Sequence, residues 1–211
     1  KATQNNGSCL YKNTKIQPEY SIKLNDSVKE TSGLIAFDNL LWTHNDDHDK
    51  TIYGLDSIGK IRRKIILEHA VNNDWEEISQ DSTHIYIGDF GNNASGNRTD
   101  LKILKINKTS FLNENPIIET ISFKYSDQTD FSAKKPNTTN FDCEAFIVSK
   151  DSIYLFTKQW KSSKTSIDAL PNQPGKYTAQ LKQTFDTKGL VTGATYLESK
   201  KIIVLCGYSK L

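Results

Sequence analysis

The chain has 211 residues, 36% of them hydrophobic, and its 27 basic and 25 acidic residues leave a net charge of +2. This length and apolar content predict a globular protein with one or two cores. The near balance of charge argues against nucleic acid as a partner, and no apolar run approaches the about 20 residues of a membrane-spanning helix.

Residues 1–19 are polar and rich in turn-forming residues, so they predict a tether before a folded domain over residues 20–211. The sequence contains no methionine, and we expect that an export signal has been removed before the first residue. An exported protein would be periplasmic, attached to the cell surface or secreted. Cys9 lies in this tether, and no apolar stretch precedes it as a lipid anchor would require.

One motif returns four times along the chain, each time followed by a short polar turn and a β-rich run. Its equivalent positions are Ser32, Glu76, Glu144 and Thr192, at intervals of 44, 68 and 48 residues. A repeat of this length built from short strands is typical of β-propeller blades.

The strands expected in chain order follow alternation of apolar and polar residues and turn signals between them. They divide into blades at 33–37, 40–43, 51–55 and 60–67; at 76–80, 84–88, 101–106 and 119–125; at 144–148, 152–157, 177–181 and a weak 183–185; and at 192–197 and 201–206. The predicted fold is therefore all-β, a propeller of four-stranded antiparallel blades.

The fourth blade has only two predicted strands, whereas a closed propeller joins its first and last blades. We expect further C-terminal blades beyond this sequence, with residues 20–24 supplying an outer strand to the last of them. Cys143 and Cys206 lie in apolar strand patterns and are expected to be buried thiols.

Connections between the second and third strands of each blade are long and polar, at residues 44–50, 89–100 and 158–176. In a propeller these connections emerge on one rim. Long loops gathered on a rigid scaffold are where binding residues usually lie.

Two copies of Asp-x-Glu enter first strands, at Asp74-Trp75-Glu76 and Asp142-Cys143-Glu144. Glu76 and Glu144 would approach the channel from separate blades, with Asp89 at the end of a second strand as a third candidate. Carboxylates brought together suit calcium or another divalent cation, or acid–base chemistry. The alternative is that they accept hydrogen bonds from free amides at strand ends and bind nothing.

The loops offer further candidates for ligand binding. The first loop supplies His44, Asn45 and Asp46, although these can equally form turns in a solvated loop. Other candidates are Asp74, Asn92, Asn93, Arg98 and Trp160. No phosphate-loop, dinucleotide or EF-hand pattern is present, and no catalytic residue is assigned.

Segments around residues 30–34, 41–46, 74–78 and 85–93 resemble a group of exported bacterial propellers similar to the SdiA-regulated and phytase-like propellers. The resemblance covers residues 30–106 well and the rest loosely. It implies a divalent cation in or near the channel, held by Glu76, Glu144 and Asp89. Glu77 and Ala145 stand where those relatives have glycine, and acidic clusters are too few for a phytase site.

Two functional classes remain open. One is a non-catalytic envelope propeller that binds a small-molecule or protein ligand on its long-loop rim, with a divalent cation at the channel mouth. The other is a metal-dependent hydrolase of the lactonase or phosphoesterase type. A solvent-open channel holding a metal-bound water would favour the enzyme, and a channel plugged by side chains would favour the binder.

Overall fold

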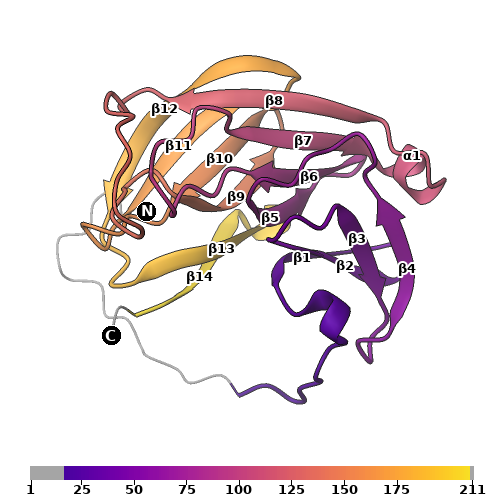
Figure 1. The fold of residues 1–211 in the computed structure, drawn as a ribbon. Helices are drawn as coiled ribbons and strands as arrows, with labels where there is room; N and C mark the ends of the chain where they lie inside the picture. The colour runs from indigo at the N-terminus through magenta and orange to yellow at the C-terminus, as the bar shows by residue number, and fades with distance from the viewer. Residues whose placement is uncertain (1–16, 210–211) are drawn as a thin grey trace.

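Antiparallel meanders of short strands make up residues 17–209, which are the residues that the computed structural model describes (Figure 1). The first meander is a separate four-stranded sheet: β1 (Thr31–Phe37), β2 (Leu40–Asn45), β3 (Thr51–Leu55) and β4 (Ile61–Ile66). The predicted turn between β3 and β4 is confirmed, because Gly59 has a φ of 73° and donates a hydrogen bond to Asp56. All four strands of this meander were expected from the sequence.

Two further meanders share one eight-stranded sheet. The second meander is β5 (Trp75–Gln80), β6 (His84–Asp89), β7 (Lys102–Asn107) and β8 (Ile118–Tyr125), and the third is β9 (Cys143–Ser149), β10 (Ser152–Thr157), β11 (Thr165–Pro171) and β12 (Gly175–Phe185). The outer strands β8 and β12 pair in parallel, Ile121 opposite Gly175 and Tyr125 opposite Ala179. The expectation of separate sheets is therefore wrong here. A short helix, α1 (Lys108–Leu112), which was not predicted, links β7 to β8.

The third meander differs from its prediction. Its third strand is β11, which lies inside the predicted long loop 158–176, and the strands expected at 177–181 and 183–185 are parts of the single strand β12. β11 contains Ser166, Asp168 and Pro171, residues that disfavour a strand, but its position between β10 and β12 fixes it. The loop between β10 and β11 is consequently short, at residues 158–164.

The last two strands, β13 (Leu190–Leu197) and β14 (Ile202–Tyr208), form a two-stranded sheet with the turn η2 (Glu198–Lys200) between them. Cys143 is buried as expected, whereas Cys206 is exposed. The reason is that β14 pairs only with β13 within residues 17–209, so its side chains have no neighbouring sheet to cover them.

First strands of the four meanders lie side by side in chain order: β1 against β5, β5 against β9 and β9 against β13. The buried apolar side chains form clusters between successive meanders. Trp42 and Trp75 belong to the cluster between the first and second, Phe90 and Phe146 to the one between the second and third, and Val191 to the one against β13. The burial of these apolar side chains between successive meanders therefore holds the first strands next to one another.

Each first strand contains a β-bulge at the repeated motif. The extra residue is Glu76 in β5, Glu144 in β9 and Thr192 in β13, and in β1 the register shifts just after Ser32. Bulges increase local twist and redirect side chains, and they are frequent next to functional sites. Glu76, Glu144 and Thr192 are therefore equivalent in the ladders, as the sequence predicted, whereas Ser32 is paired with His44 and corresponds to the residue before them.

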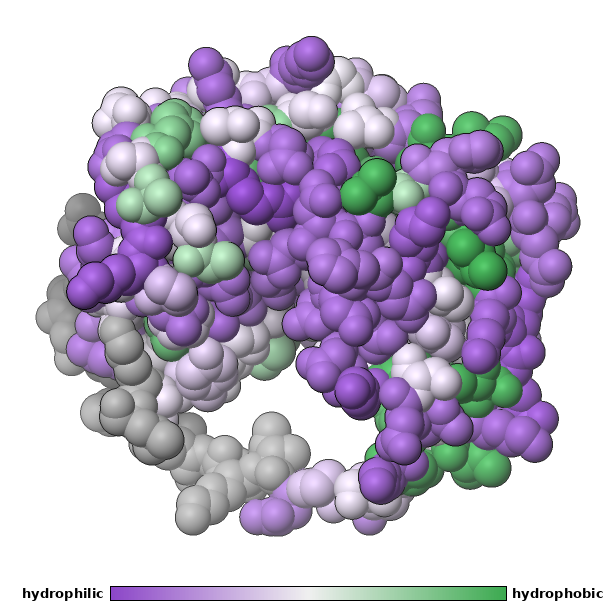
Figure 2. Space-filling model, in the orientation of Figure 1, coloured by the Kyte–Doolittle hydropathy of each residue, from purple (hydrophilic) through white to green (hydrophobic). Residues whose placement is uncertain are grey.

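Residues 20–24, expected as an outer strand, form no strand, and the short turn η1 (Asp26–Val28) follows them. Cys9 and most of the predicted tether lie outside the described residues. No helix within residues 17–209 is long and apolar enough to cross a membrane. The face in Figure 2 is mainly hydrophilic, with apolar side chains in separate patches.

Candidate metal centre

Side-chain alternation explains why acidic residues gather where β5 and β9 begin. Trp75 and Cys143 are the middle residues of the two Asp-x-Glu motifs, and both are fully buried in apolar clusters. Because residues two apart in a strand share a face, the flanking acids turn to the opposite side. The packing of β5 against β9 then brings the two acidic pairs together.

Three of these acids form a compact group, called here the acidic cluster: Glu76, Asp142 and Glu144. One carboxylate oxygen from each lies within 4.8 Å of the other two, and all three residues are buried. The sequence-predicted pair Glu76 and Glu144 is therefore brought together, and Asp142 joins it.

Gly91 gives the acidic residues room. A Cβ at this position would overlap the carboxylates of both Asp74 and Glu76. The Gly91 amide also donates a hydrogen bond of 3.2 Å to the backbone oxygen of Asp74, which holds the two segments together. Asp74 thereby lies at the edge of the acidic cluster.

The three carboxylates differ in their partners. Asp142 accepts hydrogen bonds from the Asn92 amide at 2.7 Å and from Trp160 Nε1 at 2.6 Å. Glu144 Oε1 pairs with Lys158 Nζ at 2.9 Å. Among residues 17–209, no hydrogen-bond donor or ion-pair partner reaches the carboxylate of Glu76, although only 7% of this residue is exposed.

Burial and mutual repulsion raise the pKa values of these acids. Burial, followed by the charges of Glu144, Asp74 and Asp142, raises the pKa of Glu76 to about 10. Burial and then Asp142 raise the pKa of Glu144 to about 8, and burial raises that of Asp74 to about 6. Without a cation, the acidic cluster therefore retains protons at neutral pH.

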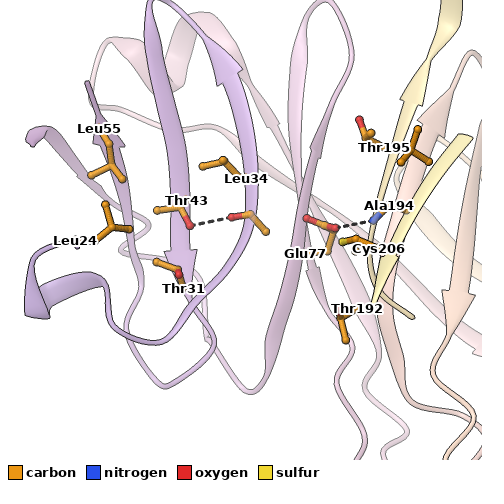
Figure 3. Close-up of a pocket in the computed structure, with 13 residues that line it drawn as sticks. Leu24, Thr31, Leu34, Thr43, Leu55, Glu77, Thr192, Ala194, Thr195 and Cys206 are labelled. Carbon is orange, nitrogen blue, oxygen red and sulfur yellow. Dashed lines mark hydrogen bonds between the residues drawn. The ribbon is translucent and has the colours of Figure 1, made fainter. Parts of the chain in front are cut away.

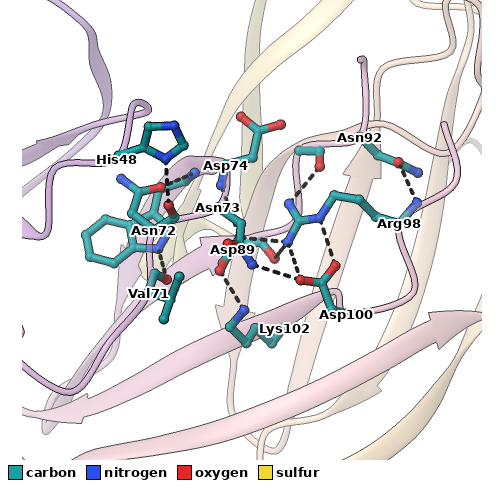
Figure 4. A network of polar contacts seen from close by, with 12 residues as sticks. His48, Val71, Asn72, Asn73, Asp74, Asp89, Asn92, Arg98, Asp100 and Lys102 are labelled. Carbon is teal, nitrogen blue, oxygen red and sulfur yellow. Dashed lines mark hydrogen bonds and ion pairs between the residues drawn. The ribbon is translucent and has the colours of Figure 1, made fainter. Parts of the chain in front are cut away.

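Asp89 lies outside the acidic cluster, in a network of its own (Figure 4). Its carboxylate pairs with Arg98 at 2.8 Å and with Lys102 at 2.7 Å, and it also accepts a hydrogen bond from the Asp74 amide. Two cations balance its single charge, so Asp89 supports the loop instead of facing Glu76 and Glu144.

Arg98, expected to contact a ligand, is engaged within the loop between β6 and β7. Besides Asp89, it pairs with Asp100 at 3.0 Å and donates to the Gly91 oxygen at 2.8 Å. Arg98 thus fixes the backbone at Gly91, next to the acidic residues. Its role in the structure is to position that loop.

The first-loop candidates are not members of the acidic cluster. His44 is fully buried with its ring edge against Trp75, and burial lowers its pKa to about 4, so it is neutral. Asn45 donates to the Ser27 oxygen and to Asp49. Asp46 is partly exposed, and burial followed by Glu30 raises its pKa. These three residues hold the loop in shape.

Asn92 and Trp160 are supports of the cluster, because both donate to Asp142. Asn93 is half-buried, and its backbone oxygen accepts a hydrogen bond from Asn137. Sequence reasoning did not place Asp142 or Lys158 in the site. The repeated Asp-x-Glu carried a signal for Asp142, whereas nothing in the sequence marks Lys158.

A separate cavity of about 470 Å³ lies between β1 and β13 (Figure 3). Its lining is largely apolar or hydroxyl-bearing, and Glu77 is its acidic residue. Glu77 accepts hydrogen bonds from the amides of Ile78 and Ala194, and burial raises its pKa to about 8. This cavity does not include the acidic cluster.

Comparisons with known proteins give no family. No family model matches the chain, and no curated protein matches it. Among solved structures, the chain is similar to the crystal structure of the computationally designed Ika4 protein, with 12% identity, a TM-score of 0.39, and 90% of this chain and 99% of that chain covered. A likeness this distant supports no conclusion about fold or function.

Proposed function

We propose that this chain is a β-propeller binding protein with a divalent-cation site at the acidic cluster. The propeller assignment is supported by the side-by-side first strands, the repeated bulge and the apolar clusters between successive meanders. Side-by-side first strands and apolar clusters between successive meanders are what radial packing of blades requires. Export to the bacterial envelope remains a proposal that rests on the sequence resemblance.

The observation that carries the cation proposal is the Glu76 carboxylate. It is more than nine-tenths buried, it has no donor within residues 17–209, and it faces the carboxylates of Asp142 and Glu144. Without a metal this acid keeps its proton, because a buried charge is costly unless it is paired or coordinates a metal. A bound cation would supply the missing partner.

Calcium fits the donors best. Calcium takes oxygen ligands at about 2.3–2.6 Å, so two oxygens on one ion are at most about 5 Å apart. The 4.8 Å limit within the cluster lies inside that span. Carboxylates are hard ligands that suit calcium or magnesium, whereas the nearest thiol, Cys143, faces the apolar core.

Calorimetric and thermal-melting titration with calcium and magnesium tests the proposal. A ligand that binds only the folded state stabilises it by about 2.7 kcal/mol at one hundred times its Kd. We expect the melting temperature of the wild type to rise with calcium and that of Glu144→Gln to rise much less. Glu119→Gln, which removes an exposed acid outside the cluster, is the matched control. A wild type indifferent to both cations would refute the proposal.

A further inference from the structure

Lys158 occupies a place in the acidic cluster that a cation would use. Its ammonium lies 2.9 Å from Glu144 Oε1, and both side chains are at least nine-tenths buried. This is the one ion pair that reaches the cluster among residues 17–209. One positive charge faces three carboxylates, so Lys158 compensates the cluster only in part.

Two aromatic rings also lie close to the Lys158 ammonium. Lys158 Nζ lies 4.5 Å from the centre of the Trp160 ring and 5.2 Å from that of the Tyr208 ring. Aromatic faces attract an ammonium at such distances, and the attraction increases when the site is desolvated. The ammonium can therefore leave Glu144 without losing every favourable contact.

The backbone restricts this movement to the side chain. The Lys158 amide donates a hydrogen bond to the backbone oxygen of Asp142, and the adjacent Thr157 pairs with Cys143 in the ladder. The main chain of Lys158 is thus held at the start of β9, next to Asp142 and Glu144. Tyr208, in β14, is half exposed, so the aromatic side of the ammonium is the side nearer to solvent.

From this geometry we infer that Lys158 is an internal competitor of the divalent cation. In the metal-free protein its ammonium pairs with Glu144. A cation that binds Glu76, Asp142 and Glu144 displaces it toward Trp160 and Tyr208. This inference rests on the proposed cation site and adds a regulatory element, because the affinity of the cluster is set by how strongly Lys158 holds Glu144.

Lys158→Gln tests the competition by removing the charge while keeping a polar side chain. We expect this variant to bind calcium at least about fivefold more tightly than the wild type, within the range typical of coupling between two linked ligands. Lys102→Gln is the matched control, because it removes the ammonium that pairs with Asp89 outside the cluster. Its calcium affinity should change much less than that of Lys158→Gln.

Outcomes of the titration separate the two proposals. If the wild type binds calcium and Lys158→Gln binds it equally or more weakly, competition is refuted while the cation site stands. If neither protein binds calcium or magnesium, both proposals fail. Binding by Lys158→Gln alone would support competition in its strongest form, with Lys158 closing the site.

A second measurement uses the wild type and does not depend on the folding of a variant. Labelling with an amine-reactive reagent, read by peptide mass spectrometry, reports the accessibility of each lysine. Calcium should increase the labelling of Lys158, because the ammonium leaves its buried ion pair, and leave that of Lys102 unchanged. Unchanged labelling of Lys158 at a calcium concentration that saturates the site would overturn the inference.

Discussion

Glu77 in β5 accepts a hydrogen bond of 3.2 Å from the amide of Ala194 in β13. Its other oxygen accepts one of 3.0 Å from the Ile78 amide. β5 packs against β1 and β9, whereas β13 packs against β9. The Glu77 side chain therefore ties together two first strands that are not neighbours, at the wall of the 470 Å³ cavity (Figure 3).

We expect Glu77→Ala to lower the free energy of unfolding by about 1–3 kcal/mol, because the Ala194 amide would lose its acceptor. Glu77→Gln keeps one acceptor oxygen and should cost less. Urea unfolding monitors both variants, with Glu119→Ala as the control because Glu119 is exposed. Equal stabilities of Glu77→Ala and the control would show that the tie contributes nothing.

Glu76→Gln should remove a pH dependence of stability. The pKa of Glu76 is raised from 4.5 to about 10, so between these pH values the folded state holds a proton that the unfolded state has lost. The wild type therefore loses stability as pH rises through this window. In chelator, we expect the variant to match the wild type near pH 4.5 and to exceed it by up to about 5 kcal/mol at pH 8.

Calcium should reverse that order at pH 8. The wild type gains stability from the cation, whereas Glu76→Gln has lost one ligand and gains less. Chemical unfolding measures the difference in stability between the variant and the wild type at both pH values, in chelator and in calcium. A variant less stable than the wild type at pH 8 in chelator would contradict the view that Glu76 is a strained, unpartnered acid.

Gly91→Ala should disturb the acidic residues directly. The added methyl overlaps Asp74 and Glu76, and such overpacking typically costs about 1–3 kcal/mol. The same movement should weaken calcium binding. Asn93→Ala, two residues along the same loop, should stay within about 0.5 kcal/mol of the wild type. Thermal melting with and without calcium compares them, and a Gly91→Ala variant with unchanged calcium response would place the cation elsewhere.

Local patterns in the sequence predicted most strands. Those of the first two meanders are confirmed to within two residues at every end, because alternation and turn residues coincide there. β11 was missed because Ser166, Asp168 and Pro171 read as loop residues. The parallel pairing of β8 with β12 has no local signal, since it depends on which outer strands meet in space.

The candidate site was predictable in part for the same reason. The repeated Asp-x-Glu motif predicted that Glu76 and Glu144 lie close together. The prediction is confirmed because both glutamates are the extra residue of a β-bulge at the start of adjacent first strands. Asp89 could not be placed correctly, because its partners Arg98 and Lys102 reach it only once the loop has closed. The Lys158 ion pair likewise depends on β10 lying beside β9.

The ladder between β8 and β12 also determines which parts of the molecule unfold together. Separate sheets could open one at a time, each with its own free energy of opening. Here hydrogen bonds run without interruption from β5 through β8 and β12 to β9, so exposing the amides of one meander disrupts the outer edge of the other. Residues 75–185 should accordingly exchange their amide hydrogens as one cooperative unit, while β13 and β14 open at lower free energy. The acidic cluster, formed by the two ends of that unit, then persists through the fluctuations that release the last two strands.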